Sequence, residues 1–352
     1  MRLADRISQC RTPFIVENTK DGSVTHLNNA AAFSKDIESC ATRYVLNDDL
    51  TRLCTALAYS KGANTLACAD LLHVPAERVW VEWTEAPRRK ELECYGFRNP
   101  AQSAYAGRRG VFIQSTPQGR RGLLRTFWAS GDSDLNVLSS SMEAYFDFDA
   151  QEGDDPTVFD GRQGPSICVS DNAAGKADIL RRCFRFRFER SWQDYYDSAQ
   201  LTSEQAAAVS RHALGTIAID IPVVSAFFLL LATRPGLPRR PLMLERINRA
   251  RSKSGKARLL DQIEVCSPLL PEYRPSGDGS PAVGRRPSRL HHVRGHLVRR
   301  GSQIFWRVPH LRGSARSGVI HTRTVTWMVE PSARERSAPH AAGAVESSDQ
   351  AA

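Results

Sequence analysis

The spacing of apolar residues between positions 28 and 74 predicts helices. Apolar side chains recur there at intervals of three and four residues, which places them on one face of a helix. The pattern covers three segments, residues 28–46, 48–62 and 64–74. The preceding residues 1–25 show no such period, so we expect an irregular start followed by N-terminal helices.

From Val79 to about residue 150, short runs rich in aromatic and β-branched residues replace the helical pattern. Gly, Pro or Asn separates the runs, as is typical of strands and turns. They read "RVWVEW", "ELECYGF", "RGVFIQST", "GLLRTFWAS" and "DLNVLSS". The pattern predicts a central antiparallel sheet of about five strands.

An acidic tract follows these strands. Residues 132–160 contain nine Asp and Glu and no Lys or Arg, but the DxDxDG order of a calcium loop is missing. A solvated acidic strand and turn is therefore the favoured interpretation. By composition alone, the tract is also able to screen a basic surface elsewhere in the chain.

Helical patterns return after Asn172. Residues 174–199 fit one long helix, although "CFRFRFER" within them alternates as a strand does. Thr202 and the following Glu204 and Gln205 predict a capped helix start.

The run "TIAIDIPVVSAFFLLLA", residues 216–232, is about as long as the shortest membrane spans. Asp220 and Pro222 lie inside it, and a carboxylate is costly at the bilayer centre, so we expect a buried core helix. Asp220 is expected to cap a backbone or to pair with an arginine from residues 181–190. An acid role for it is the alternative.

A basic helix is predicted between Pro241 and Gly255, a residue type that commonly ends helices. Its apolar face comprises Leu242, Leu244, Ile247 and Ala250. The other face carries Arg246, Arg249, Arg251 and Lys253. "RLLDQIEV" then predicts an apolar strand.

A Pro-, Gly- and Ser-rich loop over residues 267–288 follows. Next come "RLHHVRGHLVRR" and "QIFWRVPHLRG", which we interpret as a two-stranded hairpin turning at "RGSQ". Strand alternation then places Ile304 and Trp306 on one face and Phe305 and Arg307 on the other. A later strand, "GVIHTRTVTWMVE", would complete a three-stranded sheet. The tail after residue 330 lacks large apolar residues and is predicted to be disordered.

These elements predict an α+β protein with N-terminal helices, a central antiparallel sheet, central buried helices and a basic C-terminal β-hairpin lobe. The predicted divisions are an irregular start (1–25), a mixed α+β core (26–266), a basic β-rich lobe (267–330) and a disordered tail (331–352).

Composition is ordinary for a globular protein, but the net charge of +10 is uneven. Residues 234–323 contain 20 Lys and Arg against 5 Asp and Glu, whereas the remainder contains 28 against 33. Such asymmetry usually indicates a polyanionic partner. The eight cysteines show no CxxC spacing, and no apolar leader opens the chain, so reduced thiols in a cytoplasmic protein are expected.

The C-terminal histidines suggest a metal site, but their spacing opposes it. His292 and His296 lie four residues apart, about 13 Å along a strand, so they are too distant to share an ion. Motifs for nucleophiles, phosphate loops and dinucleotides are also missing. We therefore expect no metal, no cofactor and no enzymatic activity.

Nucleic-acid binding is the function that the basic segments favour. Arginines at intervals of two to five residues are able to meet successive phosphates, and Phe305, Trp306 and the histidines offer stacking faces. The predicted binding residues are Arg246, Arg249, Arg251, Lys253, Lys256, Arg294, His296, Arg299, Arg300, Trp306, Arg307 and Arg312. The alternatives are a protein-interaction factor and a metal-dependent enzyme that uses the histidines. No membrane partner is expected.

Both basic segments, and "LHVPAERVWVEW" before them, resemble uncharacterised proteins of tailed phages and prophages. The resemblance rests on an Asn-x-x-Arg helix, a Gly-Lys turn, and an Arg-Gly-His segment before a Trp-x-x-Pro strand. In this sequence it rests on Asn248, Arg249, Arg251, Gly255, Lys256, Arg294, Gly295, His296, Trp306 and Pro309. Val293 departs from the pattern, where a second arginine is more usual. The resemblance implies a phage or prophage protein in the bacterial cytoplasm, either binding nucleic acid or engaging a host or virion protein, and carries no assigned activity.

Overall fold

The computed structural model divides the chain into two compact units. The first comprises residues 1–270 and 296–307, and the second comprises residues 271–295 and 308–352. The residues described are 2–10, 16–18, 24–27, 30–59, 66–95, 107–129, 137–151, 154, 166–167, 178–233, 237–267, 289–293, 296–300, 303–307, 310–312 and 314–319. After residue 288, side chains are described only at Val298, Arg300 and residues 303–307.

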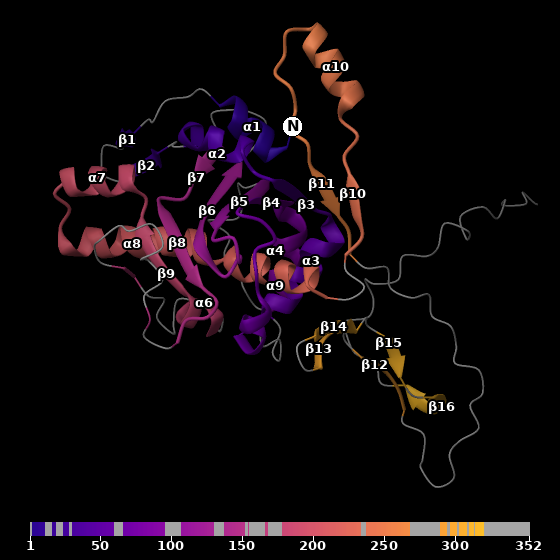
Figure 1. Ribbon diagram of the computed structural model, residues 1–352. Helices are drawn as coiled ribbons and strands as arrows, with labels where there is room; N and C mark the ends of the chain where they lie inside the picture. The colour runs from indigo at the N-terminus through magenta and orange to yellow at the C-terminus, as the bar shows by residue number, and fades with distance from the viewer. Residues whose placement is uncertain are drawn as a thin grey trace, which may run out of the picture. The chain divides into compact units, whose positions relative to one another are not determined.

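A nine-stranded open sheet forms the centre of the first unit (Figure 1). Its strand order is β10-β11-β3-β4-β5-β6-β8-β9, with β7 beside β6. The bounds are β3 Thr42–Leu46, β4 Arg78–Thr84, β5 Arg108–Ser115, β6 Arg121–Ala129, β7 Val137–Ser139, β8 Met142–Asp147, β9 Phe184–Phe188, β10 Arg239–Pro241 and β11 Ile263–Val265.

The sheet is mixed, so the α+β class is confirmed but the all-antiparallel pairing is wrong at one end. β11, β3 and β4 run parallel, whereas the remaining neighbours are antiparallel. Both parallel pairs involve β3, whose residues were predicted to lie inside a helix. Its residues 44–46 are buried between two parallel neighbours, and a short apolar run of this kind carries no strand period of its own.

Helices cover both faces of this sheet, and the alternation of side chains along β4 explains why. Val79, Val81 and Trp83 face the larger core, whereas Trp80 faces the smaller one. The larger core is built with α3 Asp48–Tyr59, α6 Asp178–Cys183, α8 Ser203–Ala218 and α9 Ile221–Leu231. The smaller core is built with α1 Leu3–Gln9, η1 Ala30–Phe33 and α2 Ser34–Glu38.

The predicted irregular start is wrong for the described residues of that segment. Residues 3–9 form α1, and β1 Val16–Asn18 pairs antiparallel with β2 Val24–Leu27. The carboxylate of Glu82 on β4 accepts hydrogen bonds from the backbone N–H groups of Leu3 (3.4 Å) and Ala4 (3.0 Å). A buried anion thus satisfies the start of a helix that has no side-chain cap of its own.

Two other local predictions are corrected. The strand predicted at "ELECYGF" is wrong for its described residues, because α4 runs over Glu85–Cys94. Residues 66–71, inside the third predicted helix, form the 3-10 helix η2 Leu66–Leu71. The undecided segment 174–199 contains α6, β9 and then α7 Arg190–Ser198, so the alternating "FRFRF" is the strand.

Within the described residues of the acidic tract, the strand is buried and not solvated, whereas the turn after it is exposed at Asp149, as predicted. All six residues of β8 are buried. Glu143 pairs with Arg125 at 2.5 Å, and Asp147 pairs with Arg121 at 2.7 Å. These carboxylates bind arginines of the adjacent strand β6, so they do not screen a distant basic surface.

One helical stretch among the described residues, Ser203–Leu231, is long and apolar enough to cross a membrane by length and composition. Within the protein, 83% of its apolar window is buried. Thr202 and Gln205 form a capping box at its start, as predicted. The stretch turns at Asp220, which separates α8 from α9.

The predicted C-terminal hairpin forms only in part. β13 His296–Arg300 pairs with β14 Gln303–Arg307 in the first unit. Ile304 is buried in the larger core and Trp306 packs against it, as the alternation predicted. In the second unit, β12 Arg289–Val293 pairs antiparallel with β15 His310–Arg312 and parallel with β16 Ser314–Val319. The predicted boundary at residue 267 therefore differs from the division into units. The loop at 268–288, the third strand beyond Val319 and the tail lie outside the described residues.

Candidate nucleic-acid interface

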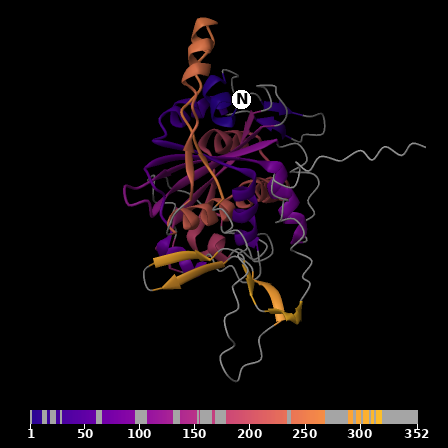
Figure 2. The same cartoon turned by 90° about the vertical axis from the view of Figure 1, so that its right-hand side faces the viewer.

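A basic projection, which we call the finger, occupies residues 237–267 at one edge of the sheet. It consists of β10, α10 Glu245–Lys253 and β11, and α10 stands away from the sheet at its tip (Figures 1 and 2). β10 and β11 form its base as an antiparallel pair. Backbone hydrogen bonds extend the pair at both ends, from Leu242 N to Gln262 O (2.9 Å) and from Cys266 N to Pro238 O (3.0 Å).

Gly255 ends α10, as predicted, because the chain reverses there with a positive φ of 68°. The N–H of Lys256 donates to the carbonyl of Arg251 (2.9 Å), and the N–H of Gly255 donates to that of Ser252 (3.1 Å). These two bonds form a Schellman motif, which satisfies carbonyls at the end of the helix.

Asn248 fixes the helix to the chain that returns from it. Its Nδ2 donates to the carbonyl of Leu259 (3.0 Å), and its Oδ1 accepts from the N–H of the same residue (2.8 Å). Arg251 adds a bond from Nε to the carbonyl of Ala257 (2.7 Å) and another from Nη2 to Gln9 of α1 (3.3 Å). Both side chains therefore act within the fold.

Asp5 of α1 holds the returning chain at the base of the finger. Its carboxylate accepts from the N–H of Leu260 (2.7 Å) and from Nε2 of Gln262 (3.4 Å). Burial raises the pKa of Asp5 to about 6, although the bond from Leu260 acts in the opposite direction. The orientation of α10 thus depends on contacts with the N-terminal helix.

The remaining basic side chains of α10 and its turn point to solvent. Arg246, Arg249, Lys253 and Lys256 are all exposed, and among the described residues none of them forms an ion pair. The finger contains eight Lys and Arg against three Asp and Glu. The structure therefore brings together five of the predicted binding residues, but Arg251 is only half-exposed and bonded within the fold.

Arg239, Arg240 and Arg258 are three further exposed cations of the finger that the sequence reasoning omitted. The signal for the first two was present in "PRRP", directly before the predicted helix. Only the pairing of β10 with β11 places them at the base of the same projection.

The apolar face predicted for this helix does not face a core. Ile247 is 48% exposed and Met243 is 79% exposed, and these are the exposed large hydrophobic residues of the described chain. Ala250 is exposed too, and the buried residue of α10 is Asn248. The prediction was wrong because the finger has no second layer against which an apolar stripe can pack.

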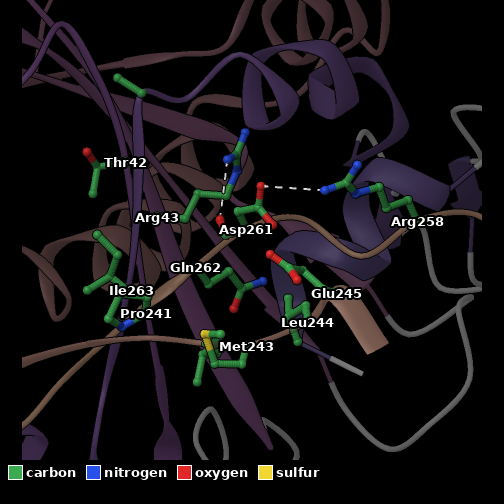
Figure 3. A pocket seen from close by; sticks show the side chains of 12 residues that line it. Thr42, Arg43, Pro241, Met243, Leu244, Glu245, Arg258, Asp261, Gln262 and Ile263 are labelled. Carbon is green, nitrogen blue, oxygen red and sulfur yellow. Dashed lines mark hydrogen bonds and ion pairs between the residues drawn. The ribbon is translucent and has the colours of Figure 1, made fainter. Parts of the chain in front are cut away.

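A cavity of about 500 Å³ lies between the base of the finger and the start of β3. Figure 3 shows Arg43 and Arg258 on either side of Asp261. Nη1 of Arg43 donates to the backbone carbonyl of Asp261 (3.5 Å), and Arg258 lies 3.9 Å from its carboxylate. The lining also includes Met243 and Glu245, so cationic, anionic and apolar groups meet there without a dominant sign of charge.

The C-terminal predicted residues are described incompletely. Arg300 and Arg307 are exposed on the β13–β14 hairpin. Trp306 is half-buried against the core and Phe305 is half-buried, which reduces the ring surface available for stacking. Arg294 and the side chains of His296, Arg299 and Arg312 lie outside the described part of the chain.

Asp220 belongs to a buried ion cluster. Its carboxylate lies 2.7 Å from Nη1 of Arg109 and 3.2 Å from Nη1 of Arg88, and Glu85 lies 2.6 Å from Arg88. Burial raises the pKa of Asp220, whereas the two arginines outweigh burial at Glu85 and lower its pKa. Pairing with arginine was predicted correctly, but the partners come from α4 and β5 and not from residues 181–190.

No group of three or more potential metal ligands occurs among the described residues. The side chains of His291, His292, His296 and His310 are not among them, so the metal hypothesis stays a prediction.

No family model matches the chain, and no curated protein or solved structure is significantly similar to it. The resemblance to phage proteins accordingly stays an expectation from the sequence.

Proposed function

We propose that this chain binds nucleic acid through the finger, as a non-enzymatic accessory protein of a phage or prophage in the bacterial cytoplasm. The phage setting derives from the sequence resemblance alone. The binding role rests on one observation: four exposed cations without ion-pair partners among the described residues lie on α10 and the turn after it, and this helix stands away from the sheet (Figure 2).

Charge supports this role over a purely structural one. The excess of cations on the finger creates a positive potential around a narrow projection, and polyanions are attracted to such potentials over a Debye length. Arg88 and Arg109 differ from the finger cations because they are buried against carboxylates inside the fold. The exposed finger cations have no comparable role in stability.

Bonds inside the protein order the finger, and this order also supports the binding role. Asn248, Arg251 and Gly255 fix the course of the finger through bonds inside the protein. A binding surface that is already ordered loses less conformational entropy on association than a flexible basic loop does. The exposed cations on α10 are thus presented on a defined surface.

The test is a salt titration with the full-length chain and three probes: a DNA duplex, the corresponding single strand and an RNA duplex. The variant replaces Arg246, Arg249, Lys253 and Lys256 by alanine. Each phosphate neutralised contributes about 0.9 to the slope of log K against log salt on duplex DNA, so the variant's slope is smaller by up to about 3.6.

The matched control removes four exposed cations elsewhere in the first unit by replacing Lys35, Lys90, Arg190 and Arg211 with alanine. It carries the same change in net charge, so we expect it to retain a slope close to that of the unchanged protein. Absence of binding to all three probes would refute the proposal. An equal loss in both quadruple variants would also refute it, because net charge alone would then explain the binding.

A second function, engagement of a host or virion protein, is favoured by Met243 and Ile247. Both side chains are exposed and Met243 lines the cavity, and exposed apolar groups of this kind are typical of protein interaction sites. Capture from host lysate treated with nuclease tests this role: the double variant Met243→Ser and Ile247→Ser should lose the captured protein, while the quadruple alanine variant of the finger should keep it. Retention by the double variant would contradict it.

A further inference from the structure

The two opposite sides of α10 differ in their contacts. Successive residues of an α-helix are rotated by about 100°, which places Asn248 and Arg251 on one side and Arg246, Arg249 and Lys253 on the opposite side. The first side bonds to the returning chain and to α1. The second side is exposed, and the exposed Ala250 borders its cations.

The size of this exposed side fits one kind of groove. An α-helix with its side chains is about 10–12 Å in diameter, and the nine residues of α10 form two and a half turns of such a helix. The major groove of B-form DNA is about 12 Å wide and admits an α-helix. Because α10 stands at the tip of the finger (Figures 1 and 2), its outer side is able to approach a surface before the sheet does.

The composition of the finger disfavours single-stranded nucleic acid, and the groove geometry of duplex RNA disfavours that ligand. Residues 237–267 contain no Phe, Tyr, Trp or His. Single strands are held mainly by stacking of their bases on such rings. The major groove of A-form RNA is deep and narrow, so side chains cannot read its bases. Cations without rings, presented on a helix, suit a B-form duplex.

We propose that α10 is a major-groove reading helix for double-stranded DNA; this inference rests on the proposed binding function. Arg246 and Arg249 lie on the side that would meet guanine edges, because arginine is the residue that pairs bidentately with guanine O6 and N7. Ala250 lies one helical turn after Arg246 and offers apolar contact to a thymine methyl group. Lys253 and Lys256, at the end of the helix, meet phosphates.

The first experiment compares the three probes by fluorescence anisotropy of the full-length chain at one salt concentration. We expect the DNA duplex to bind roughly tenfold more tightly than the single strand and the RNA duplex of the same sequence. Glucosylation of hydroxymethylcytosines fills the major groove, so it should abolish this preference. A minor-groove ligand such as netropsin should leave the preference intact.

A pair of variants tests the orientation of the helix. Ala250→Glu places a carboxylate among the exposed cations, whereas Leu244→Glu makes the same charge change four residues before Asn248, on the side of α10 that bonds to the returning chain. We expect Ala250→Glu to bind the DNA duplex roughly tenfold more weakly than Leu244→Glu, since only its carboxylate faces the groove. Circular dichroism of both variants checks that the helix is retained.

The outcomes separate the two proposals. Binding of all three probes with similar affinity, displacement by netropsin, or equal effects of the two glutamate variants would overturn the major-groove inference and leave nucleic-acid binding standing. Absence of binding to every probe would overturn both.

Discussion

Replacement of Asp220 by asparagine tests whether the buried ion cluster holds the α8–α9 turn against the sheet. Asp220 is fully buried and pairs with Arg109 and Arg88. Glu85 is the other carboxylate of the cluster, so the four side chains carry no net charge when ionised. The variant leaves two guanidinium groups with one carboxylate between them, in a place that water does not reach.

The expected loss of stability follows from these contacts. Removing one partner of a buried ion pair costs about 3–5 kcal/mol. The lower value is expected, because burial raises the pKa of Asp220 and asparagine does not carry that desolvation cost. Arg88 and Arg109 also keep bonds to the carbonyls of Ile219 (3.0 Å) and Thr216 (3.3 Å). We therefore predict a loss of about 3 kcal/mol.

Urea unfolding followed by tryptophan fluorescence measures this loss, since Trp80 and Trp83 are fully buried. With an m-value of about 3 kcal/mol/M, the midpoint should fall by about 1 M. The control is Asp49→Asn, which removes an exposed carboxylate paired with Arg52 and should cost less than about 1 kcal/mol. An Asp220→Asn midpoint within the range of the control, at the same m-value, would show that the cluster contributes little.

Three further changes test the finger and its attachment. Burial raises the pKa of Asp5 from 3.8 to about 6, so between these pH values the folded protein binds more protons than the unfolded chain and stability falls as pH rises. Asp5→Asn should flatten this fall in urea unfolding at pH 4 and pH 7, and an unchanged decline contradicts the assignment. Gly255→Ala forces alanine to a φ of 68° in open space, so it should lower the local stability of the finger by about 1 kcal/mol, measured as faster amide exchange in α10. Its control, Gly215→Ala within α8, should stabilise by about 0.5–1 kcal/mol, and equal effects would refute the role of the turn. Asn248→Ala should accelerate amide exchange across the finger while leaving the urea midpoint nearly unchanged. The reason is that both lost hydrogen bonds join Leu259 and lie outside the two cores. Amide protection equal to that of the unchanged protein would contradict the role of Asn248 in holding the finger.

The sequence predicted those elements in which a local pattern and the tertiary environment agree. β4, β5 and β6 alternate between two buried faces and carry aromatic or β-branched residues, so their strand pattern is strong. β3 is short and buried between parallel neighbours, and its apolar run was read as the end of a helix. The end of "EAPRRKELEC" resembles a strand by composition, but its residues form α4.

The sequence also predicted the candidate interface only in part. Gly255 and the row of cations indicate a basic helix with a defined end, and the structure confirms both. The sequence did not reveal which residues face inward, because that depends on Gln9 and Asp5, more than 240 positions earlier in the chain. A helical period therefore assigned Ile247 to a core that does not exist at this position.

The internal bonds of the finger also set a limit on how it binds. Arg251 already bonds to Ala257 and Gln9, so turning its guanidinium to the outer side of the helix would break bonds that hold α10. Arg246 and Arg249 have no such bonds among the described residues, and phosphates or bases are able to engage them without any change in the fold. The outer side of α10 therefore carries cations that are unbonded within the described part of the chain, whereas the cation on its inner side is bonded to the rest of the fold. A polyanion that engages Arg246 and Arg249 therefore meets the exposed side of α10, and not the side that bonds to the returning chain.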